Sequence, residues 1–123
     1  MEHAIRLNPR DPDIGLRYFQ IGTVHLLQSR TDEAIVWLEK ARSASPTLAF
    51  VPRWLASAYA LKGEPELAAA ALAEAQRWAG NGPQISIAQQ KAFGAKFFEE
   101  PATRALFETT YLAGLRKAGV PEE

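Results

Sequence analysis

Residues able to do acid–base or metal chemistry are few in this chain. Histidine occurs only as His3 and His25, and cysteine is absent, so thiolate chemistry and disulfides are excluded. Glu99 and Glu100 precede Pro101 at a predicted helix start, where carboxylates favour the helix dipole, and they lack nearby partners for acid–base work. No Gly-rich phosphate loop, nucleophile elbow or metal-ligand spacing occurs. We therefore expect no catalysis, no cofactor and no metal site.

The elements that would position any binding site follow a repeat with a period of 34 residues. Such a period is typical of stacked helical repeats. The matched positions are Ile21-Gly22 with Leu55-Ala56, His25 with Tyr59, Ala34 with Ala68, Leu38 with Leu72, and Ala41 with Ala75. His25 occupies the position that Tyr59 fills one repeat later, so we interpret it as a helix-packing residue and not as a base or ligand.

Turn and capping signals predict three helix pairs. Asp11 or Asp13 is expected to cap the first helix and Thr31 the second, while Gly80-Asn81-Gly82-Pro83 ends the second pair. The predicted helices span residues 12/13–29, 32–44, 51–62, 65–79, 84–98 and 101–118. Residues 1–8 are predicted to be the last turns of a preceding helix, which indicates a chain cut from a longer protein.

The third pair departs from the repeat, because Gln89-Gln90 stand where the period predicts Leu-Gly. A degenerate last pair is expected at the end of a solenoid, since its outer face meets water. We expect one domain with four parts: residues 1–9 as the tail helix of a preceding repeat, 15–48 and 49–82 as two repeats, and 83–119 as a divergent C-terminal capping pair.

These positions resemble the tetratricopeptide repeat family. In the first repeat they are Tyr18, Ile21, Gly22, His25, Ala34, Leu38, Ala41 and Pro46, and in the second Pro52, Leu55, Ala56, Tyr59, Ala68, Leu72 and Ala75, with Gly80 where proline would stand. Small residues such as Gly22 and Ala34 let paired helices approach closely, whereas Leu38 and its equivalents fill the space between pairs. The resemblance implies an all-α, right-handed α-solenoid of antiparallel helix pairs.

A narrower resemblance concerns the two ends of the chain. Residues 4–12 and 114–121 look like the C-terminal repeat region of bacterial class III adenylate or guanylate cyclases and of some winged-helix transcriptional regulators. In those proteins the repeats follow a catalytic or DNA-binding domain. This resemblance implies that the parent protein, and not this domain, would carry the enzyme activity.

Members of the repeat family bind partners in a concave groove formed by the first helix of each pair. Carried over by position, the groove residues are Leu16, Phe19, Thr23, Leu26, Leu27, Phe50, Arg53, Ser57, Ala60 and Leu61. Of these, Leu16, Phe19, Thr23, Phe50, Arg53 and Ser57 are the candidate partner-binding residues. The alternative is that the C-terminal or missing upstream helices cover the groove. For Phe19 and Phe50 both interpretations stay open, whereas Leu26 and Leu27 are expected to be buried between helices.

Two further features bear on the partner. A terminal carboxylate clamp of the kind found in some family members needs more than the single cation Arg53, so recognition of a chaperone tail is not expected. Trp37, Trp54 and Trp78 are candidate interface anchors, but we favour a packing role, with Trp54 toward the core and the other two partly exposed on the outer surface.

Composition narrows the class of protein further. Lys plus Arg and Asp plus Glu each number 14, and the balanced, interspersed charge argues against nucleic-acid or membrane partners. No apolar run approaches the roughly 18 residues of a membrane span, and residues 1–4 lack signal-peptide character. We therefore expect a cytoplasmic domain, and the resemblance to the cyclase and regulator tails implies a bacterial source.

The sequence as a whole predicts a non-catalytic interaction scaffold that binds a protein or peptide through its concave groove. Homodimerisation is a possible consequence of apolar surface exposed by lost repeats. The alternative is a regulatory, ligand-sensing module attached to a cyclase or transcriptional regulator. A deep pocket between the groove and the C-terminal helices would favour this alternative, and an open groove would favour peptide binding.

Overall fold

The computed structural model describes residues 13–80 and 85–123, and this part of the chain is all-helical with six helices. The first five are α1 (Ile14–Leu27), α2 (Thr31–Ala44), α3 (Val51–Lys62), α4 (Pro65–Ala79) and α5 (Ile87–Phe97). The sixth is continuous and consists of α6 (Pro101–Phe107), the π-helical segment η2 (Glu108–Leu112) and α7 (Ala113–Lys117). The predicted all-α class is therefore confirmed.

Helix boundaries agree with the sequence where proline and glycine set them. The predicted ranges 51–62 and 65–79 match α3 and α4 at both ends, because Pro52 and Pro65 suit first turns and Gly63 adopts a left-handed φ of 88°.

The predicted Thr31 cap is wrong, since Thr31 is the first residue of α2 and Arg30 precedes it. Asp13 precedes α1 without a side-chain capping bond. Asp11 and the predicted tail helix of residues 1–9 lie outside the described residues.

The start of α5 is fixed by bonds that local sequence signals do not show. Ser86 accepts a hydrogen bond from the Gln89 backbone N–H at 3.1 Å, so α5 begins later than the predicted range 84–98. The Ile87 and Ala88 N–H groups donate to the carbonyls of Pro121 and Glu122, both at 2.8 Å. The tail after α7 thus satisfies donors that the first turn of α5 would leave unpaired.

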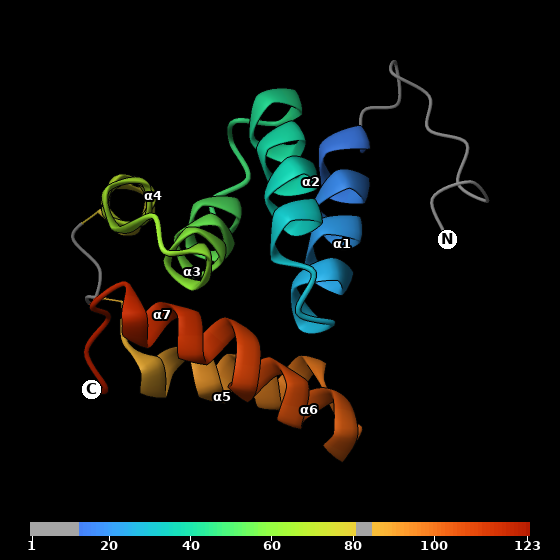
Figure 1. Cartoon of the computed structure of the whole chain (residues 1–123), viewed down its shortest axis with the longest axis vertical. Helices are drawn as coiled ribbons and strands as arrows, with labels where there is room; N and C mark the ends of the chain where they lie inside the picture. The colour runs from blue at the N-terminus through green and yellow to red at the C-terminus, as the bar shows by residue number, and fades with distance from the viewer. Residues whose placement is uncertain (1–12, 81–84) are drawn as a thin grey trace.

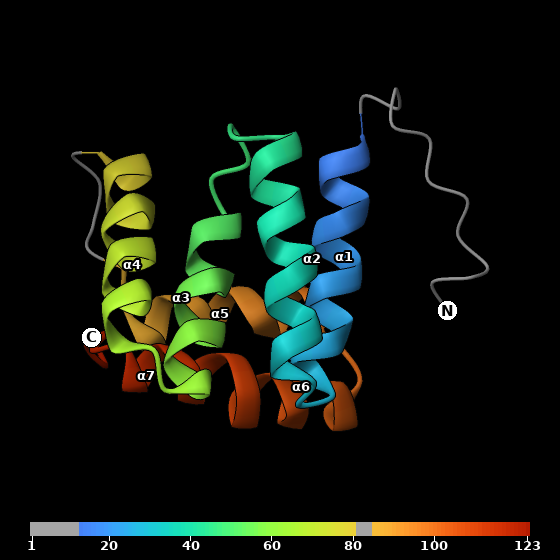
Figure 2. The same ribbon diagram turned by 45° about the horizontal axis from the view of Figure 1, so that its top comes forward.

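Helices α1 with α2 and α3 with α4 form two antiparallel pairs that lie side by side (Figure 2). The predicted close approach at Gly22 is confirmed, because a Cβ added there would lie 2.8 Å from the Leu38 Cγ. Ala34 and Ala68, the equivalent small residues of the second helices, are both buried. Helix α2 also packs against α3, and Arg42 on α2 pairs with Glu74 on α4 at 3.2 Å. The second pair therefore continues the first.

The C-terminal helices do not continue this row. In Figures 1 and 2 they run across one side of it, and α6, η2 and α7 contact α3 and α1. The expected position of this pair, as a cap at the end of the stack, is therefore wrong. The physical reason is a close approach at Gly114, where an added Cβ would lie 2.1 Å from the Ser57 Oγ and 2.5 Å from its carbonyl oxygen.

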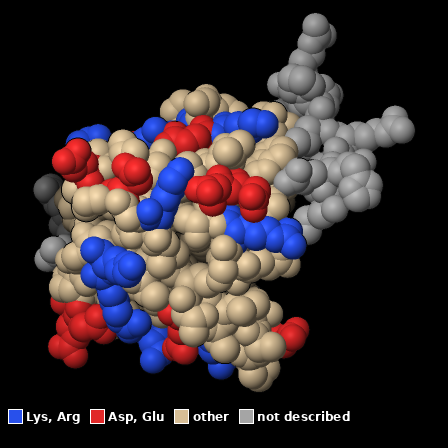
Figure 3. All heavy atoms as spheres, in the orientation of Figure 1, with Lys and Arg blue, Asp and Glu red and all other residues tan. Residues whose placement is uncertain are grey.

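The surface carries both signs of charge. On the face seen in Figure 3, lysine and arginine side chains alternate with aspartate and glutamate, and no extended area of one sign appears. None of the helices in residues 13–80 and 85–123 combines the length and the apolar character that a bilayer span requires.

Candidate functional site

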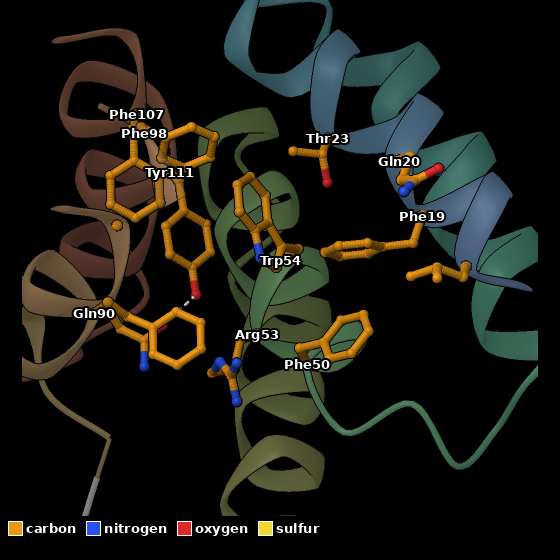
Figure 4. Close-up of a pocket in the computed structure, with 13 residues that line it drawn as sticks. Phe19, Gln20, Thr23, Phe50, Arg53, Trp54, Gln90, Phe98, Phe107 and Tyr111 are labelled. Carbon is orange, nitrogen blue, oxygen red and sulfur yellow. Dashed lines mark hydrogen bonds between the residues drawn. The ribbon is translucent and has the colours of Figure 1, made fainter. Parts of the chain in front are cut away.

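The candidate site is a pocket of about 520 Å³ between the first helices of the two pairs and the C-terminal helices. Its residues come from α1 (Leu16, Phe19, Gln20, Thr23), from the start of α3 (Phe50, Arg53, Trp54), from α5 and the turn after it (Gln90, Phe93, Gly94, Phe98), and from the sixth helix (Phe107, Tyr111). Figure 4 shows these side chains converging from both sides of Trp54. The volume lies within the usual range for small-molecule sites.

Five of the six candidate groove residues line this pocket: Leu16, Phe19, Thr23, Phe50 and Arg53. Ser57 does not, because η2 and α7 lie over it. Its side chain is fully buried and donates a hydrogen bond to the Tyr111 carbonyl at 2.8 Å. The part of the first-helix face around Ser57 is therefore closed, and Ser57 is not accessible to a partner in this structure.

The other positions carried over from the repeat pattern are structural. Leu26 and Leu27 are buried between helices, as expected. Ala60 is buried and Leu61 half-buried against the core. The pocket is thus confined to the half of the first-helix face nearest Phe19 and Phe50.

Aromatic side chains form the walls of the pocket. The ring centroids of Phe19 and Phe50 lie 4.6 Å apart, and Phe19 meets Trp54 edge-on at 5.8 Å. On the other side of Trp54, the Tyr111 ring stacks at 4.0 Å. Phe107 contacts both Trp54 and Tyr111. The expected packing role of Trp54 is confirmed, and its contacts join the repeat helices to the C-terminal pair.

A buried polar pair lies beside these rings. The Tyr111 hydroxyl donates to the Gln90 side-chain carbonyl at 2.9 Å, and both residues are buried. Burial raises the pKa of Tyr111 to about 12, against a smaller opposing effect of the nearby Arg53 charge and its hydrogen bond. The phenol therefore stays neutral at physiological pH and remains a hydrogen-bond donor.

Two polar atoms at the pocket are buried without a hydrogen-bond partner in the described part of the chain. They are the Thr23 hydroxyl oxygen and the Arg53 Nε. Such groups are rare in folded proteins, because an unsatisfied buried donor costs about 1–3 kcal/mol. Both atoms belong to residues that line the pocket, so this free-energy cost is located at its wall.

The sequence did not identify the residues of the C-terminal half of the site. In the sequence, Gln90 is notable only because it interrupts the repeat. Phe107 and Tyr111 are notable only because they lie on the apolar face of a predicted helix. No local signal says that this face meets α1 and α3, because that contact joins residues 54 positions apart in the chain. A buried glutamine opposite a tyrosine becomes recognisable only once the two helices are paired.

The other residues considered for chemistry do not enter the pocket. His25 is half-buried on α1, and Glu99 and Glu100 are exposed before α6. Within residues 13–80 and 85–123, no group of three or more metal-ligating side chains lies together. Trp37 is half-buried and its ring lies 5.6 Å from that of Tyr18, whereas Trp78 is 47% exposed.

Comparison of the chain with protein-family models, with curated proteins and with solved structures found no significant match. The function therefore has to be argued from the pocket itself.

Proposed function

We propose that this chain is a non-catalytic, ligand-sensing domain built on two tetratricopeptide-like repeats. The repeat assignment is supported by the 34-residue period, whose small positions Gly22, Ala34 and Ala68 lie buried where paired helices meet. In this proposal the domain is a short right-handed solenoid whose C-terminal helices fold back over its concave face. Ligand occupancy is then transmitted to an attached domain of a longer protein, such as a cyclase or a transcriptional regulator.

The observation that carries the proposal is the closure of the groove by the chain's own helices. An extended peptide would have to run along both first helices, but η2 and α7 already cover Ser57 and pack tightly at Gly114. What stays open is a compact pocket with aromatic walls and unpartnered polar atoms. This shape suits a compact ligand better than an extended chain.

The first experiment asks whether the pocket binds at all, with the neutral apolar dye N-phenyl-1-naphthylamine as probe. We expect saturable binding of one dye per chain, measured by its fluorescence enhancement. Gln20 is exposed at the pocket, so Gln20→Trp should fill it without disturbing the core and weaken binding at least about tenfold.

The matched control for this experiment is Glu66→Trp, at an exposed position on α4 away from the pocket. It should leave dye binding unchanged. Absence of saturable binding to the unmodified chain, or equal weakening by both substitutions, would refute the proposal.

A second candidate function is protein–protein interaction, as the sequence indicated, and exposed apolar side chains favour it. Val36, Leu67 and Trp78 on the second helices are each about half exposed, with exposed fractions of 52%, 48% and 47%. Where such side chains gather into one apolar patch, the patch often marks an interface. If they pair two copies of the chain, sedimentation velocity should show a concentration-dependent dimer that Trp78→Ser weakens. A monomer at every concentration would exclude the homodimer.

A further inference from the structure

The pocket has one charged lining residue, and that residue is a cation. Among the described residues that line it, Arg53 alone carries a charge, and no carboxylate faces it across the pocket. Carboxylates elsewhere in the described residues pair with other cations, among them Arg42, Lys62, Lys91 and Arg116. The positive charge at the pocket is therefore not neutralised by a carboxylate in the described part of the chain.

The neighbours of Arg53 do not meet its full donor capacity. A guanidinium has five N–H donors and stays charged at all physiological pH values. Its Nε is buried without an acceptor, and the side-chain carbonyl of Gln90, another residue of the pocket, already accepts a hydrogen bond from the Tyr111 hydroxyl. Tyr111 is not a counter-ion either, because its raised pKa of about 12 keeps it neutral. An anionic acceptor is the chemical partner that this arrangement lacks.

The remainder of the pocket is apolar. In Figure 4 the Arg53 head group lies between Phe50 and Gln90, and the Phe19 ring points toward Trp54 on the other side of the pocket. Leu16 and Phe93, which are 39% and 53% exposed, line the pocket where it meets solvent. A ligand that fits this pattern has a single anionic group at one end and a compact apolar body.

We propose that the ligand of this pocket is an apolar monocarboxylate, whose carboxylate is bound by Arg53 and whose apolar body packs between Phe19, Phe50 and Trp54. This inference rests on the proposed ligand-sensing function and adds the ligand class to it. A planar carboxylate matches the donor geometry of a guanidinium, and such charge-assisted bonds are stronger than bonds between neutral groups.

The experiment compares each acid with its neutral amide in displacing N-phenyl-1-naphthylamine from the unmodified chain. The probes are 4-phenylbutyrate with 4-phenylbutyramide, and decanoate with decanamide, at neutral pH. Each pair shares its apolar body and differs in the charge. We expect each acid to compete at least about tenfold more strongly than its amide, because hydrogen bonds to a charged group are stronger than those between neutral groups.

Substitution of the cation tests whether Arg53 is the source of this preference. Arg53→Met keeps an apolar stem of similar length and removes the charge, so the acid-to-amide ratio should fall to about one while the dye still binds. Arg53→Gln is a second variant with the same expectation. Arg77→Met removes an exposed cation on α4, outside the pocket, and should keep the wild-type ratio.

The outcomes separate this inference from the function on which it rests. If the dye binds and Gln20→Trp blocks it, but acids and amides compete equally, the ligand class is wrong and the binding pocket stands. An acid preference that survives in both Arg53 variants would also overturn the assignment. If the dye does not bind to the unmodified chain, the proposed function itself fails.

Discussion

The two helix pairs of the repeat and the C-terminal pair are stabilised by different kinds of contact. In the repeat, a small residue on one helix faces a large aliphatic residue on the next, as at Gly22 and Leu38. The C-terminal pair instead joins the repeat through stacked aromatic rings and buried polar bonds, those of Tyr111 above all. The first arrangement can be repeated along a chain, whereas the second fits one position only. The candidate pocket lies where these two kinds of contact meet, between the first helices of the two pairs and the C-terminal helices.

The largest loss of stability is expected from a substitution where α7 crosses α3. Gly114→Val would place a side chain against the Ser57 backbone, which cannot move aside, and should cost about 3 kcal/mol of unfolding free energy or release the C-terminal pair. Urea unfolding and amide hydrogen exchange measure this. The matched control Lys117→Val, at an exposed position on the same helix, should cost well under 1 kcal/mol.

Substitution of alanine for Gly22 in the repeat and for Gly114 in the C-terminal pair compares how much stability each close approach contributes. At Gly22 the nearest atoms belong to the flexible Leu38 side chain, whereas at Gly114 they include the Ser57 carbonyl. We therefore expect Gly114→Ala to be the more destabilising of the two. If Gly22→Ala proves the worse, the C-terminal pair is packed less rigidly than the repeat, contrary to the comparison.

A smaller loss of stability is expected at high pH, when the Tyr111 phenol ionises. The folded state holds the phenol proton up to its pKa of about 12, whereas an unfolded tyrosine releases it near pH 10. The stabilisation is therefore complete below about pH 10 and is lost as pH rises toward 12. A rise of the pKa from 10.0 to about 12 corresponds to about 2.7 kcal/mol, and Tyr111→Phe should remove that part of the pH dependence of unfolding. An unchanged slope in the variant would contradict the assignment.

The smallest changes in stability are expected from two threonine-to-valine substitutions. They should have opposite signs in the repeat and in the C-terminal pair. Thr23→Val removes a buried hydroxyl without a partner in the described chain and should stabilise the ligand-free domain by about 0.5–1 kcal/mol. Thr110→Val in η2 removes a hydroxyl that donates to the Leu106 carbonyl at 2.6 Å, and should destabilise it by about 1 kcal/mol. Thermal unfolding of both variants provides the measurement. Two shifts of the same sign would mean that Thr23 is hydrogen-bonded in solution.

Much of the first-helix side of the pocket could be read from the sequence, and its other side could not. The resemblance to the tetratricopeptide repeat predicts that Phe19, Thr23, Phe50 and Arg53 share the groove face, and all four line the pocket. Gln90, Phe107 and Tyr111 complete it from helices that the period does not describe. The binding role of these residues stays a prediction, which the dye and acid experiments are designed to test.

The sequence by itself determined where most of the helices lie, because apolar spacing, proline and glycine act within a few residues of one another. It also determined the close pairing at Gly22, since the same small and large residues recur at a fixed distance. Only the tertiary structure decided that the last helices lie across α1 and α3. That choice depends on whether Gly114 fits against Ser57 and Tyr111 against Trp54, and such fits between distant residues leave no periodic pattern in the sequence.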